Sequence, residues 1–385
     1  MKRKPMKKAL ITATVGGFLP QFEMGHARVL QRLGYEVHYA SNFHVPVYGY
    51  SREWLEERGI VCHQVDFERS PYRLWRHAGA YRQLRELLRS EPFHIIHCHT
   101  PVGGVLTRLA ARKSRKGPKP ARVVYTAHGF HFYRGGPIGS WLRSYPFESR
   151  MSLFTDILLT INREDYERAK RFCVEWRCRL VQIPGVGIPP EFYRERDPEE
   201  AAAKRKELGY GENDFLIVSV GELNSNKNHE AVIRAMEGLD EVPIKYLICG
   251  EGGRRKRLEQ LIQRAGLKER VKLAGFRSDI AQILACADCF AFPSKREGLG
   301  MAAIEAMASG LPVIAGDNRG TREYMIDGTN GIVCRNRPEE YREAIRRLYG
   351  DAELRMRMGR KARGMAMHYD AAHSDAAMRE IYRWL

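Results

Sequence analysis

Two glutamates eight positions apart, Glu297 and Glu305, flank a glycine-rich segment whose residue types suit an anionic ligand. Glu297 lies in a predicted loop and Glu305 on the helix that follows it. A helical rise of about 1.5 Å per residue would separate them by ~12 Å, close to the span of a nucleotide diphosphate-sugar. Backbone N–H groups at the helix start would meet the diphosphate, and glycine lets it approach closely. The residues predicted to bind such a diphosphate-sugar are Gly298, Leu299, Gly300, Met301 and Glu305.

The context of this glutamate pair is more specific than its spacing. Glutamates eight apart also occur at Glu167 and Glu175, Glu191 and Glu199, Glu199 and Glu207, Glu222 and Glu230, and Glu251 and Glu259. Only Glu297 and Glu305 lie between an apolar strand, Cys289–Phe292, and the turn Gly310–Pro312 that leads into a second strand, Val313–Ala315. This order predicts a strand-loop-helix-strand unit of a parallel sheet.

A lysine in the segment VGELNSNKNHEAVIRA could supply the positive charge that a leaving diphosphate needs. Lys227 follows the predicted strand Phe215–Val220 and directly precedes Asn228, a residue type that suits a helix cap. Its ammonium group could offset negative charge on the diphosphate. No D-x-D sequence, which would hold a metal ion on a diphosphate, occurs in the chain. We therefore expect no metal ion and no other cofactor.

Glycines and histidines follow several strands of the first half. Gly16 and Gly17 end the first predicted strand, and paired glycines let a phosphate or sugar approach the backbone. A turn that needs glycine for its geometry is the alternative. His128 and His131 in TAHGFHFYRG follow another strand, where a buried structural histidine is the alternative to a ligand contact. His97 and His99 share one strand face, but no Asp, Glu or third His follows at metal-ligand spacing, so a structural or acceptor-side role is expected.

Two later loops and two basic segments complete the candidate residues. Glu251 in LICGEGG and Arg277 in LAGFRSD end strands beside the same predicted ligand edge, although ordinary connecting loops would look alike. Residues 68–90 and 136–151 mix arginines with aromatic residues, a pattern that suits a membrane surface or a lipid phosphate but also a solvated helix. The residues predicted for this membrane or acceptor face are Arg73, Trp75, Arg76, Arg82, Trp141 and Arg143.

Short apolar runs alternate with helical patterns along the chain, which predicts α/β architecture with parallel sheets. The predicted strands are Ala9–Thr14, Val37–Ser41, Val61–Val65, Ile95–His97, Val123–Thr126, Ile157–Ile161, Leu180–Ile183, Phe215–Val220, Tyr246–Cys249, Val271–Leu273, Cys289–Phe292 and Val313–Ala315. Residues 184–193, PGVGIPPEFY, should form an irregular hinge. We expect domains at 1–188 and 189–369. Residues 370–385 should return to the first domain and include a final helix at 374–385.

Composition limits the partners. The net charge is +18, and residues 1–188 hold 31 Lys and Arg against 15 Asp and Glu, so an anionic partner is expected for the first half. A merely solvated basic surface is the alternative. No apolar run reaches the ~20 residues that span a bilayer, and the basic start is not followed by a signal-peptide pattern. Eight cysteines, mostly in apolar segments, favour a reducing cytoplasm; Cys286 and Cys289 have no second pair for a zinc site.

These motifs together resemble the family 4 retaining glycosyltransferases, in which an acidic residue, seven others and a glutamate precede a G-x-P-V-I turn. The resemblance covers nearly all of the chain and implies the GT-B fold, two doubly wound Rossmann-like domains facing a cleft. It implies that Lys227 and the helix start stabilise the departing nucleoside diphosphate, that Glu305 holds the ribose, and that Glu297 contacts the sugar and offsets charge at its anomeric carbon. It also favours His128 over His131 for a contact with the donor sugar. The arginine that the family usually places after Gly221 is absent here.

The resemblance extends to enzymes that build bacterial capsule, exopolysaccharide or O-antigen repeat units, because of the T-A-H-G-F-H-F and G-E-L-N-x-N-K-N runs. It implies transfer of a hexose or N-acetylhexosamine from a UDP-sugar to a glycan on undecaprenyl diphosphate, without a metal, at the inner face of the cytoplasmic membrane. Two alternatives remain: an epimerase or hydrolase of UDP-sugars with the same fold, and a nucleic-acid-binding protein. We expect no nucleic-acid partner, since charge alone leaves the glutamates unexplained.

Overall fold

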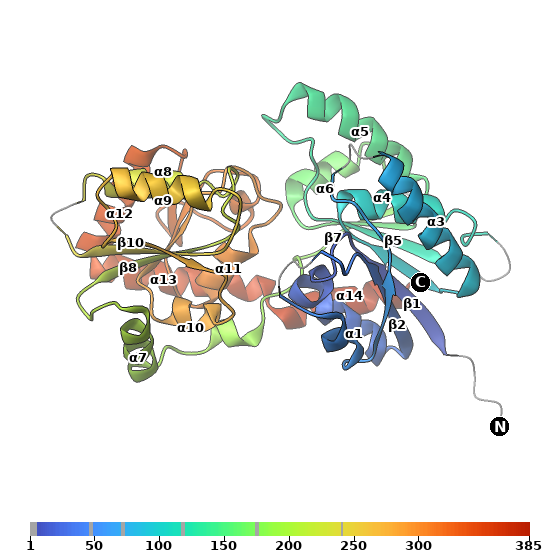
Figure 1. Cartoon of the computed structure of the whole chain (residues 1–385), viewed down its shortest axis with the longest axis horizontal. Helices are drawn as coiled ribbons and strands as arrows, with labels where there is room; N and C mark the ends of the chain where they lie inside the picture. Colours follow the sequence, from blue (N-terminus) through green and yellow to red (C-terminus); the bar gives the residue numbers. More distant parts are fainter. Residues whose placement is uncertain (1–5, 46–48, 71–73, 117–119, 174–176, 240–241) are drawn as a thin grey trace. The chain divides into compact units, whose positions relative to one another are not determined.

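The protein folds into two compact α/β units (Figure 1). A computed structural model describes residues 6–45, 49–70, 74–116, 120–173, 177–239 and 242–385. Unit 1 comprises Met1–Gly187 together with Ala371–Leu385, and unit 2 comprises Ile188–Asp370. Each unit has its own parallel sheet with helices on both faces, which is the architecture that the alternating apolar and helical patterns predict.

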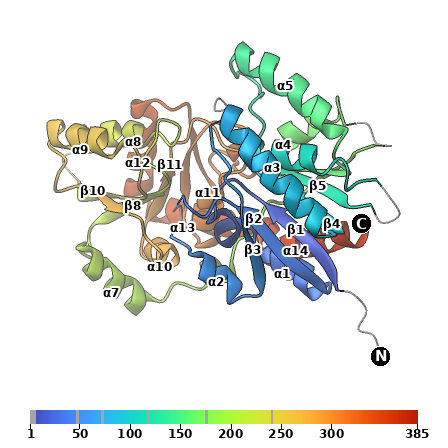
Figure 2. The same cartoon turned by 45° about the vertical axis from the view of Figure 1, so that its right-hand side comes forward.

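Unit 1 contains, within the described residues, a seven-stranded parallel sheet in the order β3-β2-β1-β4-β5-β6-β7. Figure 2 shows β1, β2 and β3 beside one another. The strands are β1 (Lys7–Thr12), β2 (Tyr35–Ser41), β3 (Ile60–Gln64), β4 (Ile95–Cys98), β5 (Arg122–Ala127), β6 (Ile157–Thr160) and β7 (Arg179–Gln182). The strand order changes direction between β1 and β4. In open parallel sheets, the loops that follow two such strands diverge and leave room for a ligand at their carboxyl ends.

The helices of unit 1 cover both faces of its sheet. Helix α1 packs with α14 on one face, and α3 packs with α4 on the other (Figure 2). These helices are π-helical η1 (Leu19–Glu23), α1 (Met24–Arg32), α2 (Arg52–Glu56), α3 (Leu74–Ser90), α4 (Pro101–Ala110), α5 (Ile138–Ser152), α6 (Arg163–Ala169) and α14 (Ala371–Arg383). Because both faces are covered, the strands read as apolar runs rather than as an alternation of apolar and polar residues.

Unit 2 contains a six-stranded parallel sheet in the order β10-β9-β8-β11-β12-β13, again within the described residues. Its strands are β8 (Phe215–Val220), β9 (Ile244–Cys249), β10 (Val271–Gly275), β11 (Cys289–Phe292), β12 (Val313–Gly316) and β13 (Gly331–Cys334). Its helices are η2 (Pro190–Tyr193), α7 (Pro198–Leu208), α8 (His229–Met236), α9 (Arg255–Arg264), α10 (Ile280–Ala285), α11 (Met301–Ala308), η3 (Thr321–Glu323), α12 (Pro338–Gly350), α13 (Ala352–Ala366) and η4 (Met367–Tyr369). Here the order changes direction between β8 and β11.

All twelve predicted strands are present, with ends displaced by at most two residues. The structure differs from the sequence-based predictions at three places. Strand β13 was not predicted, because GIVC is only four residues long and lies between turn-forming sequences. The expected irregular hinge contains the short helix η2, whose two-proline start sets the backbone angles of a 3₁₀ turn. Asn228 does precede α8, but its side chain makes no cap hydrogen bond, since the residue adopts a left-handed conformation with φ 55°.

The final helix, α14, belongs to unit 1, as the returning C-terminal helix was expected to. The Oγ of Ser374 donates a hydrogen bond to the carbonyl oxygen of Gly185 at 2.6 Å. The Tyr382 hydroxyl lies 2.7 Å from Nδ1 of His97 at the end of β4. These buried polar contacts fix α14 against the sheet that β4 belongs to.

Candidate active site

The loops after β8 and β11 are hydrogen-bonded to each other where the unit 2 sheet changes direction. The two strands are neighbours, with Cys289 paired to Ile217. Beyond their carboxyl ends, the backbone N–H of Lys295 donates to the carbonyl oxygen of Asn226 at 2.8 Å. The side-chain amide of Asn226 donates to the carbonyl oxygen of Arg296, also at 2.8 Å. The sheet topology therefore brings together two segments that lie 70 residues apart in the sequence.

These loops place Lys227 and Glu297 in direct contact. Nζ of Lys227 lies 2.7 Å from Oε1 of Glu297, and the two side chains are 22% and 13% exposed. The lysine ammonium also lies 5.2 Å from the centre of the Phe292 ring. The backbone N–H of Lys227 donates to Oδ1 of Asn224, and Nε of Arg319 donates to the carbonyl oxygen of Glu297 at 3.2 Å. Both charged groups are therefore held in place before any ligand binds.

Helix α11 begins at Met301, four residues after Glu297. Gly300 is its N-terminal flanking residue, with φ 93°. A side chain at Gly300 would meet the Phe292 ring at 2.8 Å and the Tyr324 hydroxyl at 2.9 Å, so the position requires glycine. Leu299 is buried, so its side chain is not available to a ligand. The first N–H groups of a helix, here those of Met301 and Ala302, have no acceptor within the helix and are suited to an anion. The N–H of Ala303 donates to the carbonyl oxygen of Gly300 at 3.0 Å.

Glu305 lies four residues into α11, on the same helix whose start carries these N–H groups. Burial raises the pKa of Glu305 to about 7. The nearby carboxylate of Glu191 acts in the same direction, and Lys227 opposes it. A carboxyl group with this pKa is close to half-protonated at neutral pH and can either donate or accept a hydrogen bond.

Glycines allow the segments that follow β8 and β9 to lie in close contact next to Lys227. A Cβ atom at Gly250 would lie 2.0 Å from the carbonyl oxygen of Gly221, and one at Gly252 would lie 2.6 Å from that of Leu223. Gly250 has φ 148°, a conformation that residues with side chains rarely adopt. The methylene groups of Lys227 pack on Gly221, where a Cβ atom would lie 3.2 Å from Cδ.

We predict that Gly250→Ala destabilises unit 2 by about 2–4 kcal/mol, because it combines a backbone clash with an unfavourable φ. Thermal unfolding followed by circular dichroism will measure the loss. All five tryptophans belong to unit 1, so tryptophan fluorescence should report little change. Gly253→Ala is the matched control, since no atom of the described residues lies within 4 Å of its added methyl group. Equal melting of the two variants would contradict this role for Gly250.

The other two predicted donor-binding residues of unit 2 have their charges paired elsewhere. Glu251 is exposed and forms an ion pair of 3.0 Å with Arg255, the first residue of α9. Arg277 pairs with Asp279 and, at 3.2 Å, with Glu207 of α7. The structure therefore does not bring these two side chains to the Lys227–Glu297 pair. Contacts through their backbone groups remain a prediction.

In unit 1, Gly16 and Gly17 follow β1 and are both buried. The backbone N–H of Gly16 donates to the carbonyl oxygen of Asn42 at 3.0 Å. A Cβ atom at Gly16 would lie 2.8 Å from the Phe43 ring. Close packing on the loop after β2 therefore accounts for this glycine without a ligand, and a phosphate contact at Gly16 and Gly17 remains a prediction.

His128 belongs to a cluster of imidazoles around one buried carboxylate, Glu23, which sequence reasoning missed. Nε2 of His128 lies 3.1 Å from Nδ1 of His99 and 3.6 Å from Oε1 of Glu23. The other carboxylate oxygen of Glu23 lies 2.5 Å from Nδ1 of His26. Glu23 precedes α1 in a stretch that reads as an ordinary helix start, so no local signal marked it. His97, by contrast, bonds Tyr382 and Thr126, the structural role that its position suggested.

Burial controls the protonation of this cluster. Burial lowers the pKa of His99 to about 3 and also lowers the pKa of His97 and His128. For Glu23, burial raises the pKa, but the imidazoles of His99 and His26 lower it, and the net shift is downward. Burial therefore keeps these three imidazoles neutral at neutral pH.

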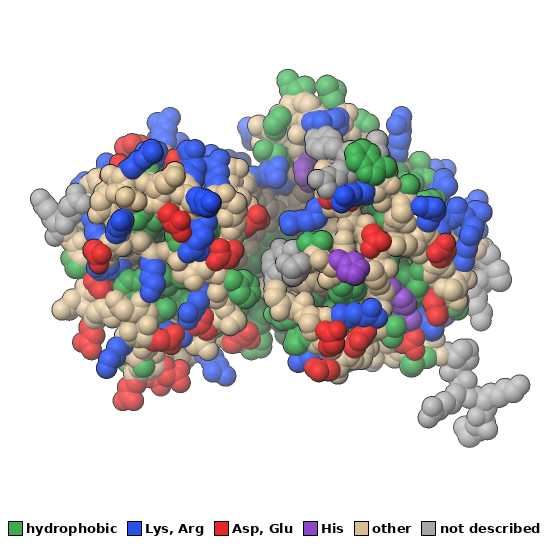
Figure 3. Space-filling model, in the orientation of Figure 1, with side chains coloured by type: hydrophobic (Ala, Val, Ile, Leu, Met, Phe, Trp, Pro, Cys, Tyr) green, Lys and Arg blue, Asp and Glu red, His purple; other side chains and the backbone are tan. Residues whose placement is uncertain are grey.

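The predicted membrane face is partly revised by the structure. Arg73 lies outside the described residues. Trp75 is 75% exposed on α3, near exposed Arg76 and Arg82. Trp141 is instead half-buried: its Nε1 donates to the carbonyl oxygen of Tyr133, and the Arg168 guanidinium lies 4.5 Å from its ring centre. On the same helix, α5, the exposed residues include Arg143 and the apolar Ile138, Leu142 and Phe147. Figure 3 shows green, hydrophobic side chains on the surface around α5.

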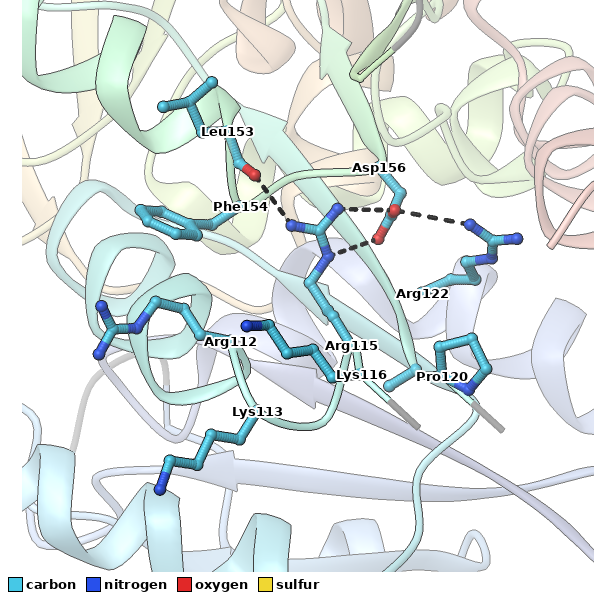
Figure 4. A pocket seen from close by; sticks show the side chains of 10 residues that line it. Arg112, Lys113, Arg115, Lys116, Pro120, Arg122, Leu153, Phe154 and Asp156 are labelled. Atoms are coloured by element: carbon cyan, nitrogen blue, oxygen red, sulfur yellow. Dashed lines mark hydrogen bonds and ion pairs between the residues drawn. The ribbon is translucent and has the colours of Figure 1, made fainter. Parts of the chain in front are cut away.

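A basic pocket of about 560 Å³ lies at the other edge of the unit 1 sheet (Figure 4). It is bordered by Arg122 at the start of β5 and Asp156 just before β6. Asp156 pairs with Arg115 at 2.8 Å and with Arg122 at 3.7 Å. Since ligands of parallel sheets bind at the carboxyl ends of the strands, this pocket at the amino ends is not part of the candidate active site.

None of the helices in the described residues is long and apolar enough to cross a bilayer.

Known proteins resemble this chain over nearly its whole length. Residues 200–365 match the family "Glycosyl transferases group 1", and residues 25–184 match "Glycosyltransferase Family 4". A Bacillus subtilis (strain 168) protein named "Putative glycosyltransferase EpsD" is 37% identical over 98% of this chain and 96% of its own. An Escherichia coli enzyme, "UDP-Gal:alpha-D-GlcNAc-diphosphoundecaprenol alpha-1,3-galactosyltransferase", is 29% identical over 70% of each chain.

Solved structures agree in fold. Anabaena Alr3699/HepE, crystallised in complex with UDP-glucose, superimposes with a TM-score of 0.80 at 19% identity, over 98% of this chain and 100% of its own. WaaG, described as a glycosyltransferase involved in lipopolysaccharide biosynthesis, gives 0.74 at 21% identity, over 97% and 99%. At these identities the structures support the two-unit GT-B architecture. With this fold and these relatives, the chain belongs to the family 4 glycosyltransferases.

Proposed function

We propose that this glycosyltransferase moves a hexose or N-acetylhexosamine from a UDP-sugar to a glycan carried on undecaprenyl diphosphate, keeps the anomeric configuration, and needs no metal ion. The observation that carries the proposal is the 2.7 Å contact between Lys227 and Glu297 at the start of α11. It sets a fixed cation and a fixed anion near the first N–H groups of a helix. A diphosphate leaving group and a positively charged sugar carbon need this combination of charges.

The cationic and anionic groups stabilise different parts of the reacting donor. As the bond between the anomeric carbon and the diphosphate oxygen breaks, Lys227 and the start of α11 stabilise the negative charge on the diphosphate. Glu297 contacts the sugar and offsets positive charge at the anomeric carbon. The acceptor hydroxyl bonds to that carbon from the face that the diphosphate leaves, and its proton passes to the departing diphosphate oxygen. Glu305 accepts hydrogen bonds from the ribose hydroxyls. The sugar contact of His128 stays a prediction from the family resemblance.

The relatives support the choice of donor and acceptor. The name of the Escherichia coli relative states a UDP-galactose donor and a diphosphoundecaprenol acceptor. HepE, which shares the fold, was crystallised with UDP-glucose. The excess of basic residues in the first half of this chain suits an anionic acceptor and an anionic membrane. A role in cell-surface polysaccharide synthesis at the inner face of the cytoplasmic membrane is part of the proposal.

We expect α5 to contact that membrane through Ile138, Leu142 and Phe147, which are 77%, 73% and 44% exposed. Burying one large apolar side chain in the bilayer interface contributes about 1.5–3 kcal/mol. Leu142→Glu should therefore weaken binding to anionic phospholipid vesicles by about tenfold, as measured by cosedimentation. Met356→Glu is the control, because Met356 is 57% exposed but lies on α13 of unit 2. A similar loss with both variants would contradict a specific role for α5.

The proposed reaction is tested by nucleotide release from UDP-, GDP- and ADP-sugars, with and without a lipid-linked acceptor extract. Acceptor-dependent release of UDP is expected from the wild type, with a rate lower by about 10²-fold or more in Glu297→Ala. Glu259→Ala is the matched control, since it removes an exposed glutamate of α9 whose charge is paired with Arg255. Release without any acceptor product would favour a hydrolase, and equal release by Glu297→Ala would refute the assigned site.

A further inference from the structure

Three side chains of unit 1 converge on one point at the place where its sheet changes direction. Glu23 ends η1, His99 follows β4, and His128 follows β5. Nδ1 of His99 lies 3.1 Å from Nε2 of His128. Oε1 of Glu23 lies 3.5 Å from the first nitrogen and 3.6 Å from the second. The three atoms form a nearly equilateral triangle.

The size of this triangle fits a tetrahedral metal ion. Zinc bonds to imidazole nitrogen and carboxylate oxygen at about 2.0–2.2 Å, so two ligands of a tetrahedral zinc ion lie about 3.3–3.6 Å apart. The two distances to the glutamate fall in this range, and the imidazole pair is shorter by about 0.2 Å. Two imidazoles and one carboxylate also form a ligand set typical of zinc or iron(II) rather than of magnesium or calcium.

We propose that Glu23, His99 and His128 bind a divalent transition-metal ion, with its fourth position left to water or to a further ligand. Local spacing could not suggest this site, because the glutamate precedes His99 by 76 residues and His128 follows it by 29. The parallel sheet brings them together, since the segments after β1, β4 and β5 meet at the same edge.

An unsatisfied buried oxygen supports the proposal independently of the triangle. The Glu23 side chain is 1% exposed, and its Oε1 has no hydrogen-bond partner among the described residues. Its other oxygen, Oε2, is held by His26. Leaving a buried carboxylate oxygen without a partner costs free energy, and a bound cation would remove that cost. His26 would then orient the carboxylate, as partners of metal ligands commonly do.

The local backbone also fits a binding site. Glu23 is the last residue of η1, a five-residue π-helix, and such turns are frequent at functional sites. Glu23 and His99 are buried, whereas the His128 side chain is 25% exposed. An ion would therefore enter, and keep its open position, on the side of His128. This binding does not depend on the proposed transfer reaction. It would occupy the His128 nitrogen and so compete with any sugar contact there.

Metal titration of the whole chain, after treatment with a chelator, tests the site directly. We expect one Zn²⁺ ion per chain by calorimetry, and visible d–d absorption of a low-coordinate complex when Co²⁺ is used instead. Mg²⁺ should produce no heat. Glu23→Gln and His128→Gln should each weaken Zn²⁺ binding by at least about 100-fold. His131→Gln, in the same loop as His128, is the control and should bind like the wild type.

Two results would overturn the proposal: no Zn²⁺ binding by the wild type, or equal binding by Glu23→Gln and His128→Gln. Far-ultraviolet circular dichroism of each variant without metal checks that it is folded. If buried Glu23→Gln is unfolded, His128→Gln still decides, because its side chain is partly exposed. Nucleotide release measured in parallel keeps the two hypotheses separate. An enzyme that binds Zn²⁺ but releases no nucleotide would refute the proposed reaction and not this site.

Discussion

Replacing Lys227 by methionine is expected to lower kcat by about 10²–10³-fold while UDP affinity falls by no more than about tenfold. The reason is that negative charge on the diphosphate grows as the bond to the sugar breaks. An interaction that strengthens in the transition state affects kcat more than ground-state binding. Lys227 is already fixed by Asn224 and by its ion pair with Glu297, so it stabilises that charge without reorganising.

Steady-state kinetics and UDP titration of the same preparations measure the two effects. Lys256→Met is the matched control, because Lys256 is exposed on α9 of the same unit, and it should keep wild-type kcat. Lys227→Arg tests whether charge alone is enough. It should recover part of the rate, since arginine keeps the charge but not the position of the ammonium group. If Lys227→Met raised only KM, Lys227 would act in substrate binding alone.

The second large effect concerns Glu305, whose removal should change the dependence of both binding and stability on pH. Burial raises the pKa of this carboxyl group to about 7. If the ionised form accepts hydrogen bonds from the ribose, UDP affinity of the wild type should fall by about tenfold for each pH unit below 7. Glu305→Gln should bind UDP more weakly at pH 8, and its affinity should vary little between pH 6 and 8. A parallel decline in both proteins would contradict the proposed ribose contact.

The same shift makes a prediction for unit 2 stability. Below pH 4.5, the normal pKa of the group, Glu305 is protonated in the folded and unfolded chains and has no effect on the balance. Between pH 4.5 and 7 only the unfolded chain ionises, so folding becomes less favourable as pH rises; above pH 7 the loss is complete. After discounting for partial exposure, Glu305→Gln should raise the unfolding free energy by about 2 kcal/mol at pH 8. It should have little effect at pH 4.5, as measured by urea unfolding followed by circular dichroism.

Glu191 provides an internal control for this pH effect. Its carboxylate on η2 is the second cause of the raised pKa of Glu305, after burial. Glu191→Gln should therefore move the midpoint of the UDP-binding profile to lower pH without abolishing binding. An unchanged midpoint would leave burial as the sole cause.

Strand positions and the loop-helix placement of Glu297 and Glu305 could be predicted from sequence because they depend on neighbouring residues. Apolar runs indicated where the strands lie. The glycines before α11 and the Gly310–Pro312 turn after it indicated where that helix begins and ends. The contact between Lys227 and Glu297 also follows, once the strands that precede them are known to be neighbours in the sheet.

Properties that depend on distant residues could not be predicted in this way. Glu23 looks like any glutamate near a helix start, and only the folded sheet shows that it is buried between His99 and His128. Trp141 has the residue type of a membrane anchor, yet packing against Tyr133 and Arg168 turns it inward. Arg277 follows a strand at the ligand edge, but Glu207 and Asp279 determine where its charge lies.

The path of the chain also determines the order in which the protein can fold during its synthesis. The chain enters unit 2 at Ile188 and leaves it at Asp370, and the two ends lie side by side. The backbone N–H of Ile188 donates a hydrogen bond of 2.7 Å to the carbonyl oxygen of Tyr369, and Ile188 forms a β-bridge with Asp370. Unit 1 lacks α14, with the partners of His26 and His97, until unit 2 has been synthesised. Unit 1 begins first in the sequence but can be completed only after all of unit 2 has been translated. Until α14 emerges, the buried surface that it covers on β4 and α1 remains open to chaperones or to other nascent chains.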